Sequence, residues 1–225
     1  MKGVFVTGTD TGVGKTLAAC ALIHALASRG LAVVPMKPVA AGAAQVAGRW
    51  VNEDTQALME AAGLDVERAG IVTPVLLREP MAPHIAAERE GRVITLEPIL
   101  DAFRRLQSIG GFMVVEGVGG FRVPLSDRVD SVALASALGL PVVLVVGMRL
   151  GCLNHALLTT QAIEAAGLPL AGWIANHVDP QMAAQEENVA ALEARIEAPM
   201  LGRIPFSPGA SVAATARYLE TGALG

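Results

Sequence analysis

The chain has 225 residues, of which 52% are hydrophobic and 17% charged, so it has enough apolar surface to fold, and disorder is excluded. Its net charge of −4 argues against a non-specific nucleic-acid binder or a polybasic membrane binder. The longest apolar run, residues 138–148, is shorter than a membrane span of about 20 residues. We therefore expect a soluble, cytoplasmic protein with one domain over residues 1–225.

Short apolar runs alternate with helical patterns along the chain. Strands are predicted over residues 4–6, 31–36, 112–115, 142–146, 170–175 and 199–204, and helices over residues 16–28, 153–166, 182–196 and 212–219. Continuous apolar strands separated by helices favour a parallel sheet covered on both faces, that is, a doubly wound α/β fold. Ligands of such sheets bind beyond the carboxyl ends of the strands.

The first predicted strand leads into a glycine-rich turn, residues 7–16, which ends in Gly14-Lys15-Thr16 and opens a helix. Backbone N–H groups of such a loop converge on phosphate oxygens. Lys15 would reach the β- and γ-phosphates, and the Thr16 hydroxyl would hold Mg²⁺. The spacing departs from the standard loop, because Gly8 is one residue too early and Thr9 stands where the first glycine belongs. An ordinary glycine-rich turn is the alternative.

Lys37 ends the second predicted strand. The chain contains only three lysines against fourteen arginines, and Lys15 is another of them. A lysine directly after a buried strand points to a second cation beside the phosphates, where it would stabilise charge during phosphoryl transfer. The alternative is a solvated residue at the strand end.

Acidic residues at two positions are candidate Mg²⁺ ligands. Glu116 ends the third apolar strand and is followed by glycines, as suits a direct or indirect ligand. Asp54 lies at the start of a predicted helix, where capping is the alternative role. Its neighbour Glu53 is an equal contender on these grounds.

Two further segments follow strands. Residues 150–155 open a helix whose free N–H groups could bind a carboxylate, unless this is a plain helix start. Asn176 and His177 end the next strand, where an amide could read the edge of an adenine. A role in a turn or cap is the alternative.

Several motifs together resemble the dethiobiotin synthetase family. They include the loop of residues 8–16, Lys37-Pro38-Val39-Ala40 and Glu116-Gly117-Val118-Gly119-Gly120. Residues 83–86, 124–127, 150–155 and 172–176 also match, so that the resemblance runs from residue 2 to about residue 207. It implies a fold like that of P-loop nucleoside triphosphatases.

The resemblance implies an ATP- and Mg²⁺-dependent cyclo-ligase that condenses CO₂ with 7,8-diaminononanoate to form dethiobiotin, ADP and phosphate. A carbamate and then a carbamic–phosphoric anhydride are the implied intermediates. Family members are homodimers, with a substrate site that both subunits share. The implied catalytic residues are Lys37 and Lys15.

The resemblance also assigns binding residues one by one. The implied metal ligands are Thr16, Asp54 and Glu116, which decides against Glu53. The implied nucleotide-binding residues are Gly12, Val13, Gly14, Lys15, Thr16, Leu17, Asp54, Glu116, Gly117, Val118, Gly119, Asn176, His177, Pro205, Phe206 and Ser207. The implied substrate-binding residues are Thr11, Lys37, Ala41, Leu150, Gly151, Cys152, Leu153 and Asn154, the last five acting across the subunit interface.

Two residues depart from the family pattern. Ala41 stands where the family often has serine, which removes a hydroxyl contact to substrate, and Gly12 stands where it often has glutamate.

A second hypothesis is an ATPase switch of the partition or septum-site type, but these proteins carry an additional lysine at the start of the loop, and residues 8–10 contain none. An amidotransferase-type ligase would need a further glutaminase region, for which the chain has no room.

Overall fold

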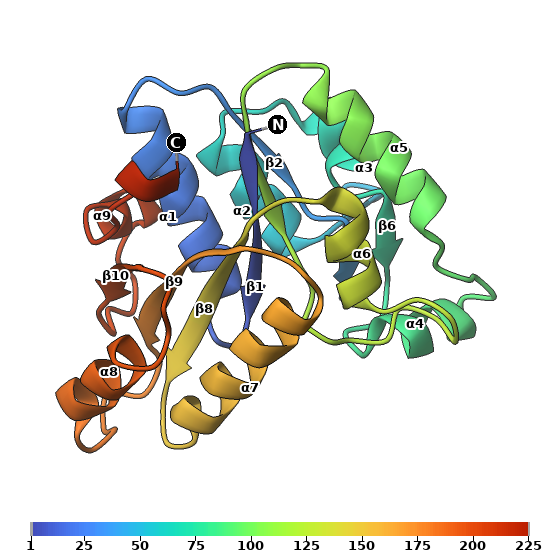
Figure 1. Cartoon of the computed structure of the whole chain (residues 1–225). Helices are drawn as coiled ribbons and strands as arrows, with labels where there is room; N and C mark the ends of the chain where they lie inside the picture. The colour runs from blue at the N-terminus through green and yellow to red at the C-terminus, as the bar shows by residue number, and fades with distance from the viewer. Residues whose placement is uncertain (1, 225) are drawn as a thin grey trace.

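The structure, a computed structural model, describes residues 2–224 and is built around a six-stranded parallel sheet (Figure 1). The strand order is β10-β9-β8-β1-β7-β2. The strands are β1 (Gly3–Gly8), β2 (Val33–Met36), β7 (Phe112–Glu116), β8 (Val142–Met148), β9 (Leu170–His177) and β10 (Met200–Ile204). The prediction of a doubly wound parallel sheet is confirmed.

Helices cover both faces of this sheet (Figure 1). The helices are α1 (Lys15–Ser28), α2 (Glu53–Ala61), α3 (Ala69–Val72), α4 (Pro83–Arg89), α5 (Leu96–Gln107), α6 (Ser131–Leu138), α7 (Cys152–Ala165), α8 (Gln185–Glu193) and α9 (Val212–Ala216). The side chains of β1 alternate between two hydrophobic clusters. Val4 and Val6 pack with residues of α1, whereas Phe5 packs in another cluster with residues of α5 and α6. Successive side chains of a strand point to opposite faces, so one buried strand serves both layers.

Two small sheets and the α2 helix lie beside the carboxyl end of β2. Strand β3 (Val39–Ala41) pairs in parallel with β6 (Val75–Leu77), and β4 (Ala44–Val46) forms a hairpin with β5 (Arg49–Val51). Asn52 caps α2, since its side chain accepts a hydrogen bond from the Thr55 N–H. This cap leaves the nearby residue Asp54 free to serve elsewhere.

Two helices are shorter than predicted. Helix α8 begins at Gln185 rather than at residue 182, because Asp179 organises a turn in which its side chain accepts from the Gln181 N–H. Helix α9 ends at Ala216 rather than at residue 219, because Leu219 forms a β-bridge with Gly202 of β10. In both cases, residues at the predicted end of the helix form other hydrogen bonds instead of continuing the helix.

Both cysteines, Cys20 and Cys152, are buried and free, as their spacing indicates. Within residues 2–224, no helix combines the length and the hydropathy that a membrane crossing requires.

Candidate functional site

The loop between β1 and α1 is anchored by close packing. The Val13 side chain is buried, and a Cβ at Gly147 of β8 would stand 2.8 Å from its Cγ1 atom. Gly14 has φ +83°, and a Cβ there would overlap the Asn176 amide. Asn176 in turn donates a hydrogen bond from Nδ2 to the Val13 carbonyl at 2.8 Å. The ends of β8 and β9 therefore fix the shape of the loop.

Lys15, the first residue of α1, folds its side chain back over this loop. Its Nζ atom donates to the Asp10 carbonyl oxygen at 3.0 Å. Burial, and then the nearby charge of Lys37, lower the pKa of Lys15 from 10.5 to about 8, against the smaller opposing effects of three carboxylates. An anion bound at the loop would give this ammonium group a stronger partner than a carbonyl.

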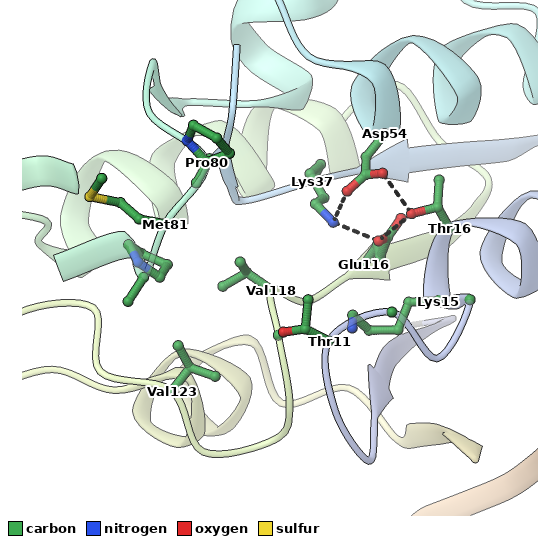
Figure 2. Close-up of a pocket in the computed structure, with 16 residues that line it drawn as sticks. Thr11, Lys15, Thr16, Lys37, Asp54, Pro80, Met81, Glu116, Val118 and Val123 are labelled. Atoms are coloured by element: carbon green, nitrogen blue, oxygen red, sulfur yellow. Dashed lines mark hydrogen bonds and ion pairs between the residues drawn. The ribbon is translucent and has the colours of Figure 1, made fainter. Parts of the chain in front are cut away.

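Lys37 lies directly after β2 and is only 3% exposed, so the alternative of a solvated strand-end residue is wrong. Its Nζ atom donates to Glu116 Oε1 at 2.5 Å and to the Gly117 carbonyl at 3.2 Å, and lies 2.8 Å from Asp54 Oδ2. Figure 2 shows this ammonium group between the two carboxylates.

Thr16 completes the cluster. Its hydroxyl oxygen lies 2.8 Å from Asp54 Oδ1 and 2.9 Å from Glu116 Oε1 (Figure 2). One hydroxyl has a single proton to donate, so the two carboxylates cannot both be satisfied by it. Glu53, the other acidic residue at this helix start, is exposed and takes no part in the cluster.

The three charged groups of this cluster shift one another's pKa. Burial alone would lower the pKa of Lys37, but Glu116 and Asp54 outweigh it and raise that pKa above 10.5. Burial would raise the pKa of Asp54, but the charge and hydrogen bond of Lys37 outweigh it, so that this pKa falls below 3.8. Complete burial raises the pKa of Glu116 above 4.5. The site therefore has negative charge that a further cation would stabilise.

The residues present suit Mg²⁺. Glu116 Oε2 is buried and has no hydrogen-bond partner among the described residues, and a buried carboxylate oxygen without a partner is costly. Mg²⁺ typically uses one or two carboxylates and takes its remaining ligands from water and phosphate, which matches Thr16, Asp54 and Glu116. Residues 2–224 contain no cluster of three or more His, Cys, Asp and Glu side chains for a metal held by protein alone.

These residues line one cavity of about 730 Å³ at the carboxyl ends of β1, β2 and β7. Its polar side contains eleven of the residues predicted from the sequence to bind nucleotide, metal or substrate: Thr11, Gly12, Gly14, Lys15, Thr16, Lys37, Ala41, Asp54, Glu116, Val118 and Gly119. Its other wall is largely apolar and consists of Pro80, Met81, Ala82, Pro83 and Val123. The cavity therefore suits a ligand with a charged end and an aliphatic body.

A second cavity, of about 460 Å³, brings together the segments expected near adenine. Leu17, Asn176, His177, Pro205, Phe206 and Ser207 line it. Within the described residues, Nδ1 of His177 is buried without a hydrogen-bond partner. Leu17 and Thr16 are neighbours in α1, so the two cavities flank the same helix start.

Three predicted groups lie outside these cavities. Val13 is buried in the core, and Gly117 offers its carbonyl to Lys37 instead of lining the cavity. Residues 150–154 do not border either cavity in this chain, and Leu150 is 95% exposed at the start of α7.

Sequence reasoning missed the apolar wall and the cap of α2. Pro80, Met81 and Val123 lie in turns without periodicity, so nothing in the sequence places them opposite Lys37. Asn52 had a readable signal, because asparagine directly before Glu53 and Asp54 is a common N-cap pattern.

Comparison with known proteins gives the following similarities. A family model described as an AAA domain matches residues 2–213. The "ATP-dependent dethiobiotin synthetase BioD" of Nitrosospira multiformis is 56% identical over 91% of this chain and 88% of its own length. The proteins with the same name from Aromatoleum aromaticum and Ralstonia nicotianae are 53% and 54% identical over 96% of this chain, covering 96% and 94% of their own lengths.

Solved structures show the same fold at low identity. A ParA family ATPase from Chlorobium tepidum has a TM-score of 0.57 at 16% identity, with 96% of this chain and 97% of that chain covered. The cell division ATPase MinD from Pyrococcus furiosus has a TM-score of 0.54 at 15% identity, with 96% and 95% covered. At this identity the likeness concerns architecture alone.

Proposed function

The chain belongs to the ATP-dependent dethiobiotin synthetase family, and on this basis we propose that it condenses CO₂ with 7,8-diaminononanoate to give dethiobiotin, ADP and phosphate. The observation that carries the proposal is the convergence of Lys15, Lys37, Thr16, Asp54 and Glu116 on one cavity with an apolar wall. The six-stranded sheet, with strands drawn from residue 3 to residue 204, supports a single ligase domain over residues 1–225.

The reaction needs an activated carbamate. One substrate amine captures CO₂ and loses a proton, and a carbamate oxygen attacks the γ-phosphorus of ATP, so that the bond to the β-phosphate oxygen breaks and ADP leaves. The second amine then attacks the carbamate carbon and loses a proton. The bond from this carbon to the phosphorylated oxygen breaks, and phosphate departs as the cyclic urea closes. Attacking oxygen and phosphoryl group are both anionic, so their approach requires positive charge.

Lys15 and Lys37 supply this charge, and both lie on the polar side of the cavity. Lys37 is held by Asp54 and Glu116, so its ammonium group is oriented before the substrates arrive. Among the described residues, Lys15 has a carbonyl oxygen as its hydrogen-bond partner, and it exchanges this partner for a phosphate oxygen. Holding both reactants in line contributes the entropic part of the rate enhancement.

Thr16, Asp54 and Glu116 would hold Mg²⁺, which when bound neutralises charge on the β- and γ-phosphates. The unpartnered Oε2 atom of Glu116 supports this assignment. The nucleotide base would occupy the second cavity beside Leu17 and Asn176. ATP as co-substrate also supports a cytoplasmic location.

The apolar wall would receive the alkyl chain of the diamine, with Thr11 and the Ala41 backbone at its polar end. Leu150, Gly151 and Asn154 are exposed around the start of α7, which supports the proposal that residues 150–154 serve the substrate carboxylate of a second subunit. Sedimentation tests this homodimer: wild type is expected to sediment as a dimer and Leu150→Arg as a monomer. A monomeric wild type would contradict the shared site.

The direct test uses purified protein with ATP, Mg²⁺, bicarbonate and the diamine, with mass spectrometry of the products. We expect dethiobiotin, and one ADP for each dethiobiotin formed. Lys2→Gln is the matched control for substitutions of Lys15 and Lys37, since Lys2 is the third lysine of the chain and is exposed. Its turnover should equal that of wild type. ATP hydrolysis without dethiobiotin would overturn the proposal and favour an ATPase switch.

A further inference from the structure

The loop of residues 8–16, here called the phosphate loop, carries an ion pair that has no part in the proposed mechanism. Arg149, which follows β8, places Nη2 2.6 Å from Asp10 Oδ2. The two side chains are 39% and 48% exposed, so the pair stands at the rim of the loop. It joins the loop to the end of a neighbouring strand across 139 residues of sequence.

Asp10 contacts two residues of the cavity lining in addition to Arg149. Its other carboxylate oxygen, Oδ1, accepts a hydrogen bond from the Thr11 N–H at 2.7 Å. Its carbonyl oxygen accepts from Lys15 Nζ at 3.0 Å. Thr11 and Lys15 both line the main cavity. A shift of Asp10 would therefore move the Thr11 backbone and the carbonyl oxygen that the Lys15 ammonium group contacts.

The negative charge of Asp10 would disfavour binding of a polyphosphate at this loop. An unpaired carboxylate beside Lys15 would repel a polyphosphate and compete with it for the ammonium group. Arg149 removes that net charge. The end of β8 is itself well fixed, since Gly8 and Val145 are paired and the Thr9 N–H donates to the Val145 carbonyl at 3.0 Å.

We propose that Arg149 is a positioning residue for nucleotide binding: it neutralises Asp10 and holds the Asp10–Thr11 corner in the conformation that admits the triphosphate. Arg149 acts through Asp10 and needs no contact with the ligand. The inference rests on the proposed function only in taking Mg-ATP as the ligand of the loop.

The test measures the Kd of Mg-ATP by calorimetry and the KM and kcat of the ligase reaction. Arg149→Met should weaken Mg-ATP binding about three- to tenfold, the range expected for a half-exposed pair together with the repulsion it leaves behind. The KM for ATP should rise by a similar factor, while kcat changes less than about twofold. Arg149→Lys, which restores the charge, should recover most of the affinity.

The double variant Asp10→Asn/Arg149→Met is the decisive one. It lacks both charges, and the asparagine side chain keeps an oxygen for the Thr11 N–H, so its Kd should return to within about threefold of wild type. The matched control is Arg104→Met, which breaks the exposed Arg104–Asp101 pair on α5 and should leave the Kd of Mg-ATP unchanged. Melting curves check that each variant is folded.

Unchanged Mg-ATP affinity in Arg149→Met would overturn the proposal. So would a double variant as weak as Arg149→Met, because the loss would then not come from the unpaired charge of Asp10. If wild type binds Mg-ATP and the variants follow the expected order, but no dethiobiotin forms, the positioning role stands and the proposed function falls.

Discussion

Lys37 pairs with Glu116, which the fold removes from water, and with Asp54, whose side chain stays 40% exposed. Glu116 is 0% exposed and Lys37 3%, and removing one member of such a buried group leaves an uncompensated charge. In the proposed mechanism the same burial strengthens the interaction of the ammonium group with a phosphoryl group, since charges interact more strongly away from water. We therefore expect both stability and turnover to depend on the Lys37 ammonium group.

We predict that Lys37→Gln remains folded but loses about 10²–10³-fold in kcat, the loss typical of one preorganised charge donor. Its free energy of unfolding should fall by about 3–5 kcal/mol at pH 7.5. The loss should be smaller at pH 5.5, because Glu116, whose pKa is already raised, takes up a proton when its partner is gone. Urea unfolding at both pH values, beside Lys2→Gln, measures this. Unchanged turnover would remove Lys37 from the mechanism.

Lys15 is expected to reduce stability in the free protein. Its pKa falls from 10.5 to about 8 on folding, so between these values the unfolded chain binds more protons than the native one, and stability contributed at this site rises with pH. Lys15→Met should therefore be more stable than wild type by about 1–3 kcal/mol at pH 7. This advantage should shrink as the pH rises from 8 to 10.5, and Mg-ATP binding should be lost at every pH. An advantage independent of pH would contradict the account.

At the scale of elements, we expect the packing of β8 against the phosphate loop to have the largest effect on nucleotide binding. Gly147 gives Val13 the space that it fills. Strand β8 is otherwise a run of buried aliphatic residues, and a larger side chain at this point would push the loop away from the helix start.

We predict that Gly147→Ala weakens Mg-ATP binding about tenfold, because the new Cβ would stand 2.8 Å from Val13 Cγ1 and overpacking displaces neighbours. The double variant Val13→Ala/Gly147→Ala should regain part of the affinity, since it removes the Cγ1 atom at 2.8 Å, while the Cβ atom of residue 13 would remain at 3.0 Å. Calorimetry with Mg-ATP measures both. If the double variant binds no better than Gly147→Ala, the loop is not displaced by this contact.

The elements differ in how well the sequence predicts them. The core strands are predictable because continuous apolar runs bounded by turns have few other interpretations. Helix α5 was missed although Ile99, Phe103 and Leu106 are buried on one face, a readable helical period. Strands β3 and β6 could not have been found, because a three-residue strand has no period of its own and forms only where its partner lies.

At the scale of the whole molecule, sheet topology explains why much of the candidate site could be predicted. Parallel strands place their carboxyl ends at one edge, so the loop after β1, Lys37 after β2 and Glu116 at the end of β7 had to meet. The choice of Asp54 over Glu53 depended on the family resemblance, and the structure places only Asp54 beside Lys37. The apolar wall comes from turns whose position depends on tertiary packing, which no local pattern encodes.

We propose that cations around the γ-phosphate let a carbamate oxygen attack it. The most direct measurement supplies freshly prepared ¹⁸O-labelled bicarbonate with ATP, Mg²⁺ and the diamine, and analyses both products by mass spectrometry. The account predicts one ¹⁸O atom in the released phosphate and one in the carbonyl of dethiobiotin. Phosphate without label, formed alongside labelled dethiobiotin, would show that water attacks the γ-phosphate and would contradict it.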